Sequence, residues 1–499
     1  MQTTAAPAPP PTLADTVHRF ARLPVLAIAG VVAIAHLVAA GLGRGYWFDE
    51  LLMLVLGRDH LDWGSADQPP LAPLLAALMD AIAPGSILAL RIPAVLATAA
   101  AVVVAALIAR ELGGDRRAQV LTAGAQATGL WATLAGHWLT PYTLEPVQWL
   151  LLCWLLVRWV RTRDDRLLLG VGVVAGIAAE TKFQVLLLCA VLVLSVLACG
   201  PRELLRRPLL WAAAGIGALL AAPTLIWQAL HGWPQLRMSP VVVAESEALY
   251  GGRWGVAVLM LVGAGLAGLV LSLYGVVRLL RAGELRPYRF LGVTAVAMYV
   301  LFVVITGRPY YLDGLYGLLA AAGAVGMQRR REARRGADTG EPSTRTWSLS
   351  WVAWPGFAAS ALLAGVLLVG APMLVAPEVP EGIVAKTAAA YRELTPEQQR
   401  RTVVFGQSYI YAAYVDGYRE RHGLPPAYSG NRSYGYFPPP SDDIDAVLFL
   451  GSDPEGLRPH FTDLRRVGDV GEDAGLWLAT GRNGSWSAVW PQLRTLSVG

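Results

Sequence analysis

Long apolar runs follow one another through residues 23–374 of this 499-residue chain, with short polar segments between them. A helix needs about 20 apolar residues to cross the hydrocarbon core of a bilayer. Hydrophobic residues make up 55% of the chain and charged residues only 15%, which is too few to cover several soluble domains. The pattern predicts an α-helical polytopic membrane protein with about 11 transmembrane helices, over residues 23–42, 87–109, 117–136, 142–160, 166–181, 183–200, 209–230, 254–280, 288–306, 309–328 and 350–374.

Arginine-rich segments alternate with arginine-poor segments between these runs. If the N-terminus is cytoplasmic, all the arginine clusters fall on the cytoplasmic side, namely "RELGGDRR", "RWVRTRDDR", "PRELLRRP", "RLLRAGELRPYR" and "MQRRREARR". The sequence therefore predicts a cytoplasmic segment (1–22), a transmembrane domain (23–374) whose first exterior loop is 43–86, and an exterior domain (375–499). It predicts a multi-pass protein of the cell (inner) membrane with the lipid bilayer, and no nucleic acid, as a partner.

The C-terminal region has the pattern of a small α/β domain. The short runs "RTVVFG", "DAVLFLG" and "WLATG" are rich in β-branched, aromatic and leucine residues and predict strands. Helical stretches are expected near 381–394 and 407–421. About 125 residues are enough for one modest core.

Two adjacent carboxylates, Asp49 and Glu50, follow the first apolar run in "GYWFDELLML". Neighbouring side chains point in different directions, so at most one of them faces a given reactive centre. A solvated loop acid or a helix N-cap is the alternative interpretation. Asp67 lies in the same exterior loop, before a Pro-Pro step that favours extended backbone. A carboxylate held at the membrane surface can act as a general base.

Further ionisable residues lie at the exterior ends of other spans, namely Glu145 in "LEPVQW", Lys182 in "ETKFQ" and Arg308 beside Tyr310 and Tyr311 in "GRPYYLDG". Each has a structural alternative: a helix-start acid, a local ion pair, and an arginine reaching to the interface. Arginine, however, offers a planar fork that matches phosphate oxygens. Together these residues indicate a cleft for an anionic, membrane-borne substrate.

The order of these motifs resembles that of the polytopic, lipid-phosphosugar-dependent glycosyltransferases of the GT-C fold. This class includes the protein O-mannosyltransferases and the lipid A aminoarabinose transferases. The matching segments, which extend over residues 45–450, are "YWFDELLML", "DQPPL", "ALRIPAVLA", "ARELGGDRRAQ", "LEPVQW", "ETKFQVL", "LIWQALHGWPQL", "GRPYYLDGLYGLLAAAGA" and "YRERHGLPPAYSGNRSYGYFPPP". The resemblance implies an inverting enzyme that moves a sugar from a polyprenyl-phosphate donor to an acceptor hydroxyl on the outer face of the membrane, in cell-envelope glycan or glycoprotein assembly.

The resemblance also implies roles for individual residues. Asp49, with Glu50 beside it, takes the catalytic position, and Glu145 and Asp67 orient the acceptor or a metal. The donor phosphate is expected at Lys182, Arg308, Tyr310, Tyr311 and Arg91. No cofactor is required, although a divalent cation between Asp49 and Glu145 stays an option.

Leu52 and Gln68 stand where the aminoarabinose transferases carry Arg and Lys, which argues against that sugar and against lipid A. A transporter or flippase of lipid-linked sugar is the alternative function, and it would be expected to carry inverted repeats and charges near the midplane. A membrane scaffold would not need acids and cations gathered at the outer mouth. The sequence identifies neither the sugar nor the acceptor, which could be a glycan, a lipid or a protein.

Overall fold

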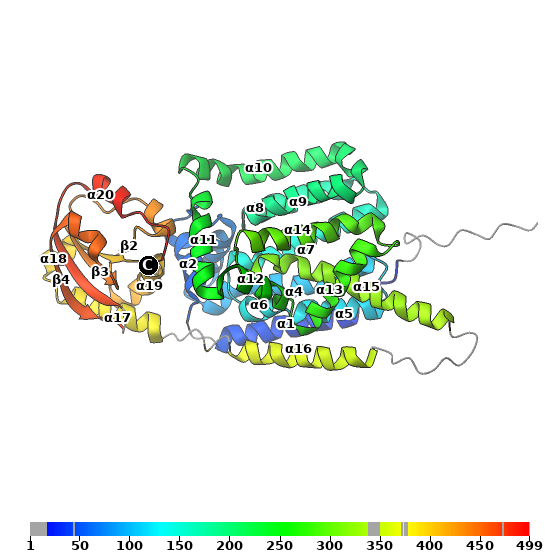
Figure 1. Cartoon of the computed structure of the whole chain (residues 1–499). Helices are drawn as coiled ribbons and strands as arrows, with labels where there is room; N and C mark the ends of the chain where they lie inside the picture. Colours follow the sequence, from blue (N-terminus) through cyan, green and yellow to red (C-terminus); the bar gives the residue numbers. More distant parts are fainter. Residues whose placement is uncertain are drawn as a thin grey trace, which may run out of the picture.

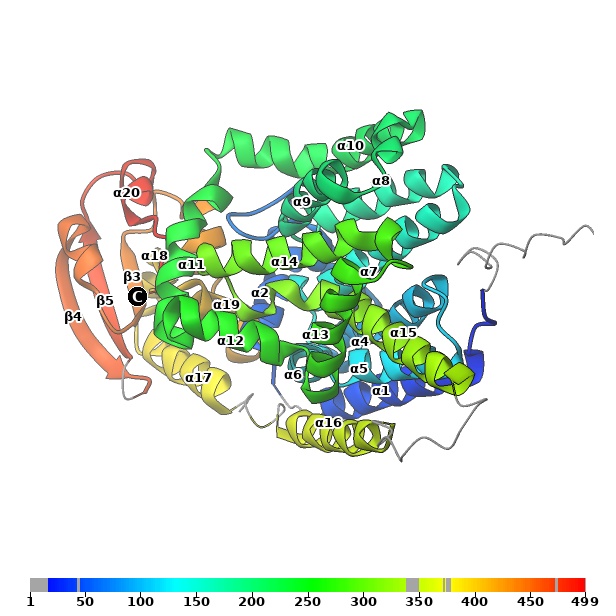
Figure 2. The same ribbon diagram turned by 45° about the vertical axis from the view of Figure 1, so that its right-hand side comes forward.

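The computed structural model describes residues 17–42, 45–337, 350–370, 373, 378–471 and 474–498. Most of the predicted N-terminal cytoplasmic segment lies outside these residues, as do residues 375–377 at the predicted start of the exterior domain. The chain forms a large helical body with a smaller α/β domain at one end of it (Figure 1). A view turned by 45° shows the same two parts side by side (Figure 2).

The helical body contains all of the predicted apolar runs. Its helices are α1 (Arg22–Leu42), α2 (Phe48–Asp59), α3 (Leu71–Ile82), α4 (Ile87–Glu111), α5 (Arg116–Ala127), α6 (Leu130–Ala135), α7 (Pro141–Thr162), α8 (Arg166–Ala179), α9 (Gln184–Cys199), α10 (Pro208–Leu230), α11 (Pro234–Tyr250), α12 (Gly252–Gly263), α13 (Leu266–Arg281), α14 (Arg289–Val304), α15 (Asp313–Ala337) and α16 (Ser350–Gly370). Helical structure is confirmed in each run over the residues that the structure describes, which leave out 371, 372 and 374 of the last run.

The expected number of about 11 spans is not confirmed. By length and composition, four helical segments of the described chain can cross a membrane: α1, α4, α10 and Arg286–Val304. The number is five if α12 and α13, which are bent by 99° at a short break, count as one span. Several other apolar helices are short, with 14 residues in α8 and 16 in α9.

Two of the predicted spans are broken, and their breaks meet. The run 117–136 divides into α5 and α6 at Thr128, and the run 254–280 divides into α12 and α13 at Gly265. Gly265 has a φ of 73°, and a Cβ atom there would lie 2.3 Å from the Thr128 carbonyl oxygen. Only glycine allows both this backbone conformation and this close approach. The break between α5 and α6 is therefore in contact with the break between α12 and α13 inside the helical body.

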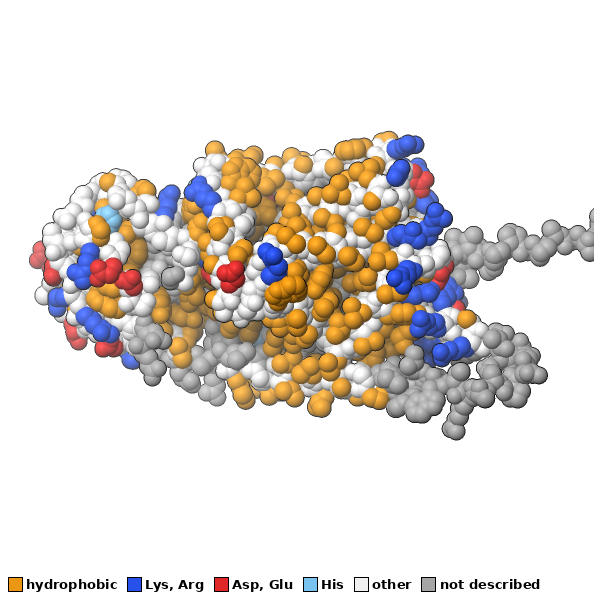
Figure 3. Space-filling view, in the orientation of Figure 1, with side chains coloured by type: hydrophobic (Ala, Val, Ile, Leu, Met, Phe, Trp, Pro, Cys, Tyr) orange, Lys and Arg blue, Asp and Glu red, His pale blue; other side chains and the backbone are white. Residues whose placement is uncertain are grey.

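Basic side chains gather at the end of the helical body that lies farthest from the α/β domain, and apolar side chains cover the flank between (Figure 3). At this basic end Glu111 pairs with Arg158 and Arg161, and Asp115 pairs with Arg331. The separation of arginine-rich ends from the α/β domain agrees with the alternation seen in the sequence.

The α/β domain contains one mixed sheet of five strands in the order β2-β1-β3-β5-β4. Strands β2, β1 and β3 are parallel, whereas β5 is antiparallel to both β3 and β4. Its elements are α17 (Glu378–Arg392), α18 (Pro396–Arg401), β1 (Thr402–Gly406), α19 (Tyr409–His422), β2 (Ala427–Tyr428), β3 (Ala446–Gly451), β4 (Phe461–Asp469), β5 (Gly475–Arg482) and α20 (Trp486–Leu493). The three predicted strands and both predicted helices are confirmed, and β2 and β4 are additional.

Each face of this sheet packs against helices, because successive strand residues point to opposite faces. Val403 and Phe405 belong to a core with Trp486 and Trp490 of α20. Val404 belongs to the opposite core, which includes buried residues of α17, α19 and the first-loop helix α2. The first exterior loop therefore forms part of the core of the C-terminal domain.

Polar contacts reinforce this docking of α2 on α19. Arg58 Nη2 donates a hydrogen bond to the Asp416 carbonyl oxygen at 2.9 Å. Arg419 pairs with Asp59 at 3.2 Å and with the Asp416 carboxylate at 3.1 Å. Because residues 50–57 of α2 are all buried, the helix is held from both sides and its N-terminal turn lies at the junction of the two parts.

Candidate active site

A cavity of about 1260 Å³ lies at this junction. Its lining comes from the first exterior loop, from α5 to α7, from α11 and from the chain around Arg308, together with Tyr409 and Arg432 of the C-terminal domain. Six residues singled out from the sequence line it: Asp49, Asp67, Lys182, Arg308, Tyr310 and Tyr311. The structure thus brings together side chains that are up to 262 positions apart within the transmembrane region, as between Asp49 and Tyr311.

Asp49 lies in the first turn of α2 and lines the cavity. The Tyr409 hydroxyl donates a hydrogen bond to Asp49 Oδ1 at 3.3 Å. Burial raises the pKa of Asp49 to about 6; the positive charges of Arg432 and Arg308 oppose this shift, and the negative charge of Asp67 adds to it. A carboxylate with such a pKa is largely ionised at pH 7 and still accepts a proton readily, as a general base must.

Glu50 turns away from the cavity toward Arg91 of α4. Arg91 donates to Glu50 through Nε at 2.9 Å and Nη2 at 2.8 Å, and also to the carbonyl oxygens of Ala40 and Gly45. Both side chains are at most 1% exposed. The expectations of a catalytic Glu50 and a phosphate-binding Arg91 are therefore revised, because neither residue lines the cavity and each neutralises the other. A buried charge needs such a partner.

Lys182 lies in the loop between α8 and α9, with its Nζ atom over the cavity aromatics. Nζ is 4.9 Å from the centre of the Tyr310 ring and 4.4 Å from that of Tyr311. Glu145 of α7 lies behind it, with Oε2 3.7 Å from Nζ, and does not line the cavity. Within the described part of the chain Nζ has no hydrogen-bond partner, so its donors remain open to an anion.

Two arginines converge on Glu245 of α11. Arg308 and Arg432 each form an ion pair with a different oxygen of the Glu245 carboxylate. Arg432 also lies 3.7 Å from Asp67, and its φ of 48° is unusual for a residue other than glycine. Such strained residues cluster at functional sites. Two guanidinium groups that bind one carboxylate can also bind a phosphate group.

Aromatic side chains form one wall of the cavity. Trp47 and Trp138 are stacked, with ring centres 4.3 Å apart and an interplanar angle of 4°. Trp47 Nε1 donates to the Tyr142 hydroxyl at 2.9 Å, and the Tyr142 ring lies 5.1 Å from that of Tyr310. Flat, partly polar surfaces of this kind suit sugar rings and apolar chains.

Several polar residues of the cavity were not singled out from the sequence, among them Tyr409, Arg432, Glu245 and Asp313. Arg432 belongs to the tail segment "AYSGNRSYGYFPPP", whose Tyr, Gly and Pro content suggested a loop that covers a cleft or stacks on a sugar ring, but Arg432 itself was given no role. Glu245 lies in a segment that was expected to be a plain exterior loop and is helical instead. Nothing local in the sequence connects Tyr409 with Asp49.

The arrangement does not fit the metal bridge considered between Asp49 and Glu145. Glu145 faces Lys182 and lies outside the cavity lining, so the two carboxylates do not face one another across it. Among the described residues there is also no group of three or more His, Cys, Asp or Glu side chains that could hold a metal ion.

The revised role of Glu50 predicts a loss of stability in the Glu50→Gln variant, because Arg91 would be left buried without a countercharge. We expect the free energy of unfolding to fall by about 3–5 kcal/mol, measured by thermal unfolding of the purified protein in detergent. Asp49→Asn, the change at the neighbouring carboxylate, should leave the stability nearly unchanged. Equal unfolding temperatures for the two variants would contradict this role.

Comparisons with known proteins agree with the architecture. Residues 67–227 match the sequence model of the family described as dolichyl-phosphate-mannose-protein mannosyltransferase. No curated protein matches the chain. The matched segment begins at Asp67 and includes Lys182, but it ends before Arg308 and the C-terminal domain.

Solved structures resemble this one over most of its length. ArnT from Cupriavidus metallidurans in the apo state has a TM-score of 0.61 at 15% identity, covering 91% of this chain and 97% of that one. The same protein bound to undecaprenyl phosphate has a TM-score of 0.59 at 15% identity, with the same coverage. An oligosaccharyltransferase from Archaeoglobus fulgidus has a TM-score of 0.53 at 12% identity, covering 82% of this chain and 64% of that one. The chain has the GT-C fold that its motifs led us to expect.

Proposed function

We propose that this chain is an inverting glycosyltransferase that moves a sugar from a polyprenyl-phosphate donor to an acceptor hydroxyl. The observation that carries the proposal is one cavity that holds a carboxylate with a pKa of about 6 beside three cationic side chains, Lys182, Arg308 and Arg432. A base and a phosphate-binding group are the two parts that this reaction requires. Two comparisons support the choice of donor class: the match of residues 67–227 to the dolichyl-phosphate-mannose-protein mannosyltransferase model, and the similar structure of ArnT bound to undecaprenyl phosphate.

Asp49 is assigned as the base. It removes the proton of the acceptor hydroxyl while the acceptor oxygen attacks C1 of the sugar from the face opposite the phosphate. The bond between C1 and the phosphate oxygen breaks, and its electron pair leaves with the lipid phosphate. The configuration at C1 is inverted, and Asp49 ends the step protonated.

Lys182 and Arg308 are assigned to the departing phosphate. The phosphate is already a good leaving group, so charge stabilisation rather than protonation lowers the barrier. Tyr310 and Tyr311 pack against the Lys182 ammonium group and fix its position. In the absence of donor, Glu245 neutralises Arg308 and Arg432, and we infer that the donor phosphate takes the place of this carboxylate.

Apolar lining residues provide a path for the polyprenyl chain. Leu186, Leu187 and Ile305 line the cavity and are also exposed on the helical body, at 41%, 41% and 43%. An isoprenoid chain could therefore lie against them while its phosphate reaches Lys182. With the arginine-rich end of the body in the cytoplasm, the cavity faces the outer side of the membrane.

The test of this function is consumption of donor. Purified protein would be incubated with membrane extract and a panel of undecaprenyl-phosphate sugars, namely mannose, galactose, glucose and arabinofuranose. We expect one donor to be consumed, and Asp49→Asn to reduce the rate by about 10²–10⁴-fold. Asp463→Asn, at an exposed position of β4, serves as the matched control. Full activity of Asp49→Asn, or no donor consumed, would instead favour the flippase or scaffold alternatives.

The raised pKa of Asp49 predicts how the rate depends on pH. Only the ionised carboxylate accepts the proton, so kcat/KM for the consumed donor should rise by about tenfold per unit below pH 6 and level off above it. The residual rate of Asp49→Asn should lack this rise. A rate of the wild type that is flat or falling between pH 5 and 7 would contradict the assignment of Asp49 as the base.

A further inference from the structure

The inner end of the cavity lies where the two helix breaks meet. The cavity continues there into a small pocket of about 10 Å³, the scale of one water molecule. Gln126, Ala132 and Asp313 line both spaces. The remaining wall consists of Tyr316, whose hydroxyl donates to the Met260 carbonyl oxygen, and of small residues, namely Ala125, Gly129, Ala264, Gly268 and Ala320. Irregular backbone within a membrane bundle is tolerated where it lines a cavity, and broken helices commonly surround substrate sites.

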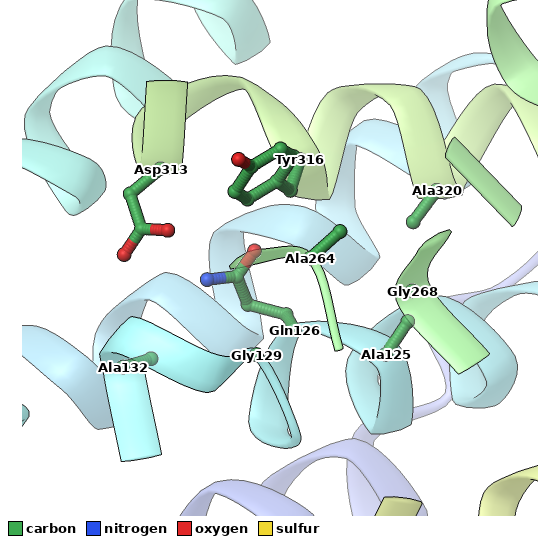
Figure 4. A pocket seen from close by; sticks show the side chains of 9 residues that line it. All are labelled: Ala125, Gln126, Gly129, Ala132, Ala264, Gly268, Asp313, Tyr316 and Ala320. Atoms are coloured by element: carbon green, nitrogen blue, oxygen red, sulfur yellow. The ribbon is translucent and has the colours of Figure 1, made fainter. Parts of the chain in front are cut away.

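Within the described chain, polar atoms without hydrogen-bond partners belong to residues that line the cavity near this end. Gln126 is 8% exposed, and its Oε1 atom has no hydrogen-bond partner among the described residues. The same holds for Trp131 Nε1. Figure 4 shows the Asp313 carboxyl group and the Gln126 amide group extending toward the same side of the pocket. A buried polar group that lacks a partner costs free energy, so these groups require a ligand or water that satisfies them.

The place of Asp313 at the start of a helix accounts for part of its environment but not for its lack of a hydrogen-bond donor. As the first residue of α15 it interacts favourably with the helix dipole. It is only 9% exposed, however, and no hydrogen-bond donor to its carboxyl group is found among the residues that the structure describes. Lys182, a cation that lines the cavity, forms its ion pair with Glu145 and not with Asp313. The carboxylate of Asp313 is therefore left as an acceptor at the end of the cavity.

The chemistry of these groups fits the hydroxyls of a sugar. A carboxylate accepts hydrogen bonds from two neighbouring hydroxyls, an amide both donates and accepts, and an indole N–H donates. The Trp131 ring lies 5.9 Å from that of Tyr310 in an edge-to-face arrangement. The two side chains thus offer an aromatic surface on which a sugar ring can pack. None of the residues that line the small pocket is Lys or Arg, so the lipid phosphate would find no countercharge there.

We propose that Gln126, Trp131 and Asp313, at the crossing of the two helix breaks, form the subsite for the sugar ring of the lipid-linked donor. The proposal rests on the proposed function of the cavity and adds the residues that select the sugar. The donor then lies with its phosphate between Lys182 and Arg308, its lipid chain toward Leu186 and Leu187, and its sugar directed inward. The ring hydroxyls take the place of water at the inner end.

The experiment compares two probes on the purified full chain in the Asp49→Asn background and without acceptor, where turnover is too slow to deplete the probe. The probes are undecaprenyl phosphate and undecaprenyl phosphate carrying mannose, galactose, glucose or arabinofuranose. Their Kd values are measured for this background and for the further changes Asp313→Asn, Asp313→Ala and Gln126→Leu. Binding of the lipid phosphate alone reports whether each variant is folded and whether the phosphate site is intact.

We expect one sugar to lower the Kd at least about tenfold relative to undecaprenyl phosphate. Asp313→Ala and Gln126→Leu should abolish most of this gain and leave binding of undecaprenyl phosphate unchanged, and Asp313→Asn should retain part of it. A gain that all variants keep, a parallel loss for both probes, or no gain with any sugar would overturn the subsite. Failure of the glycosyltransferase proposal would appear separately: the wild-type protein would not bind undecaprenyl phosphate, or would not consume any donor.

Discussion

The buried ion pair between Glu50 and Arg91 is the interaction on which the cavity depends. Arg91 uses its guanidinium group to join α4, the carbonyl groups of Ala40 and Gly45 near the end of α1, and the first turn of α2. It thereby fixes where α2 begins and how it is rotated. Adjacent residues on a helix point about 100° apart, so a Glu50 directed into the body leaves Asp49 directed at the cavity.

The same helix couples the two parts of the molecule. Beyond its first turn, α2 contributes to the core of the C-terminal domain. Tyr409, the first residue of α19 in that domain, donates a hydrogen bond to Asp49. The C-terminal domain is therefore part of the site rather than a cap on the bundle, because it supplies the hydroxyl on the proposed base and the second arginine on Glu245. Of the two adjacent acids, Glu50 pairs with Arg91 inside the body, and Asp49 lines the cavity in which we propose that the substrate binds.

Local patterns in the sequence predicted the helices of the apolar runs, two helices and three strands of the C-terminal domain, and six of the cavity residues; they did not predict the helices in the exterior loops. They succeeded because apolar runs, β-branched runs and acids at span ends are recognisable within a few positions. They failed where the outcome depends on packing between distant segments. The rotation of α2 that separates Asp49 from Glu50 is set by Arg91, and the break at Gly265 is set by its approach to Thr128. The approach of Arg432 to Glu245 depends on the docking of a domain that begins more than 130 positions later.

The central claim is that the cations around Glu245 bind a lipid phosphate. Its most direct test is the Kd of undecaprenyl phosphate for the purified wild type, for Arg308→Gln and for Glu245→Gln. Charged hydrogen bonds contribute about 1.5–3 kcal/mol, so Arg308→Gln should weaken binding roughly 10-fold or more. Glu245→Gln should strengthen it, because the phosphate no longer competes with a carboxylate for Arg308 and Arg432. Binding that neither change alters, or that Glu245→Gln weakens, would contradict the account.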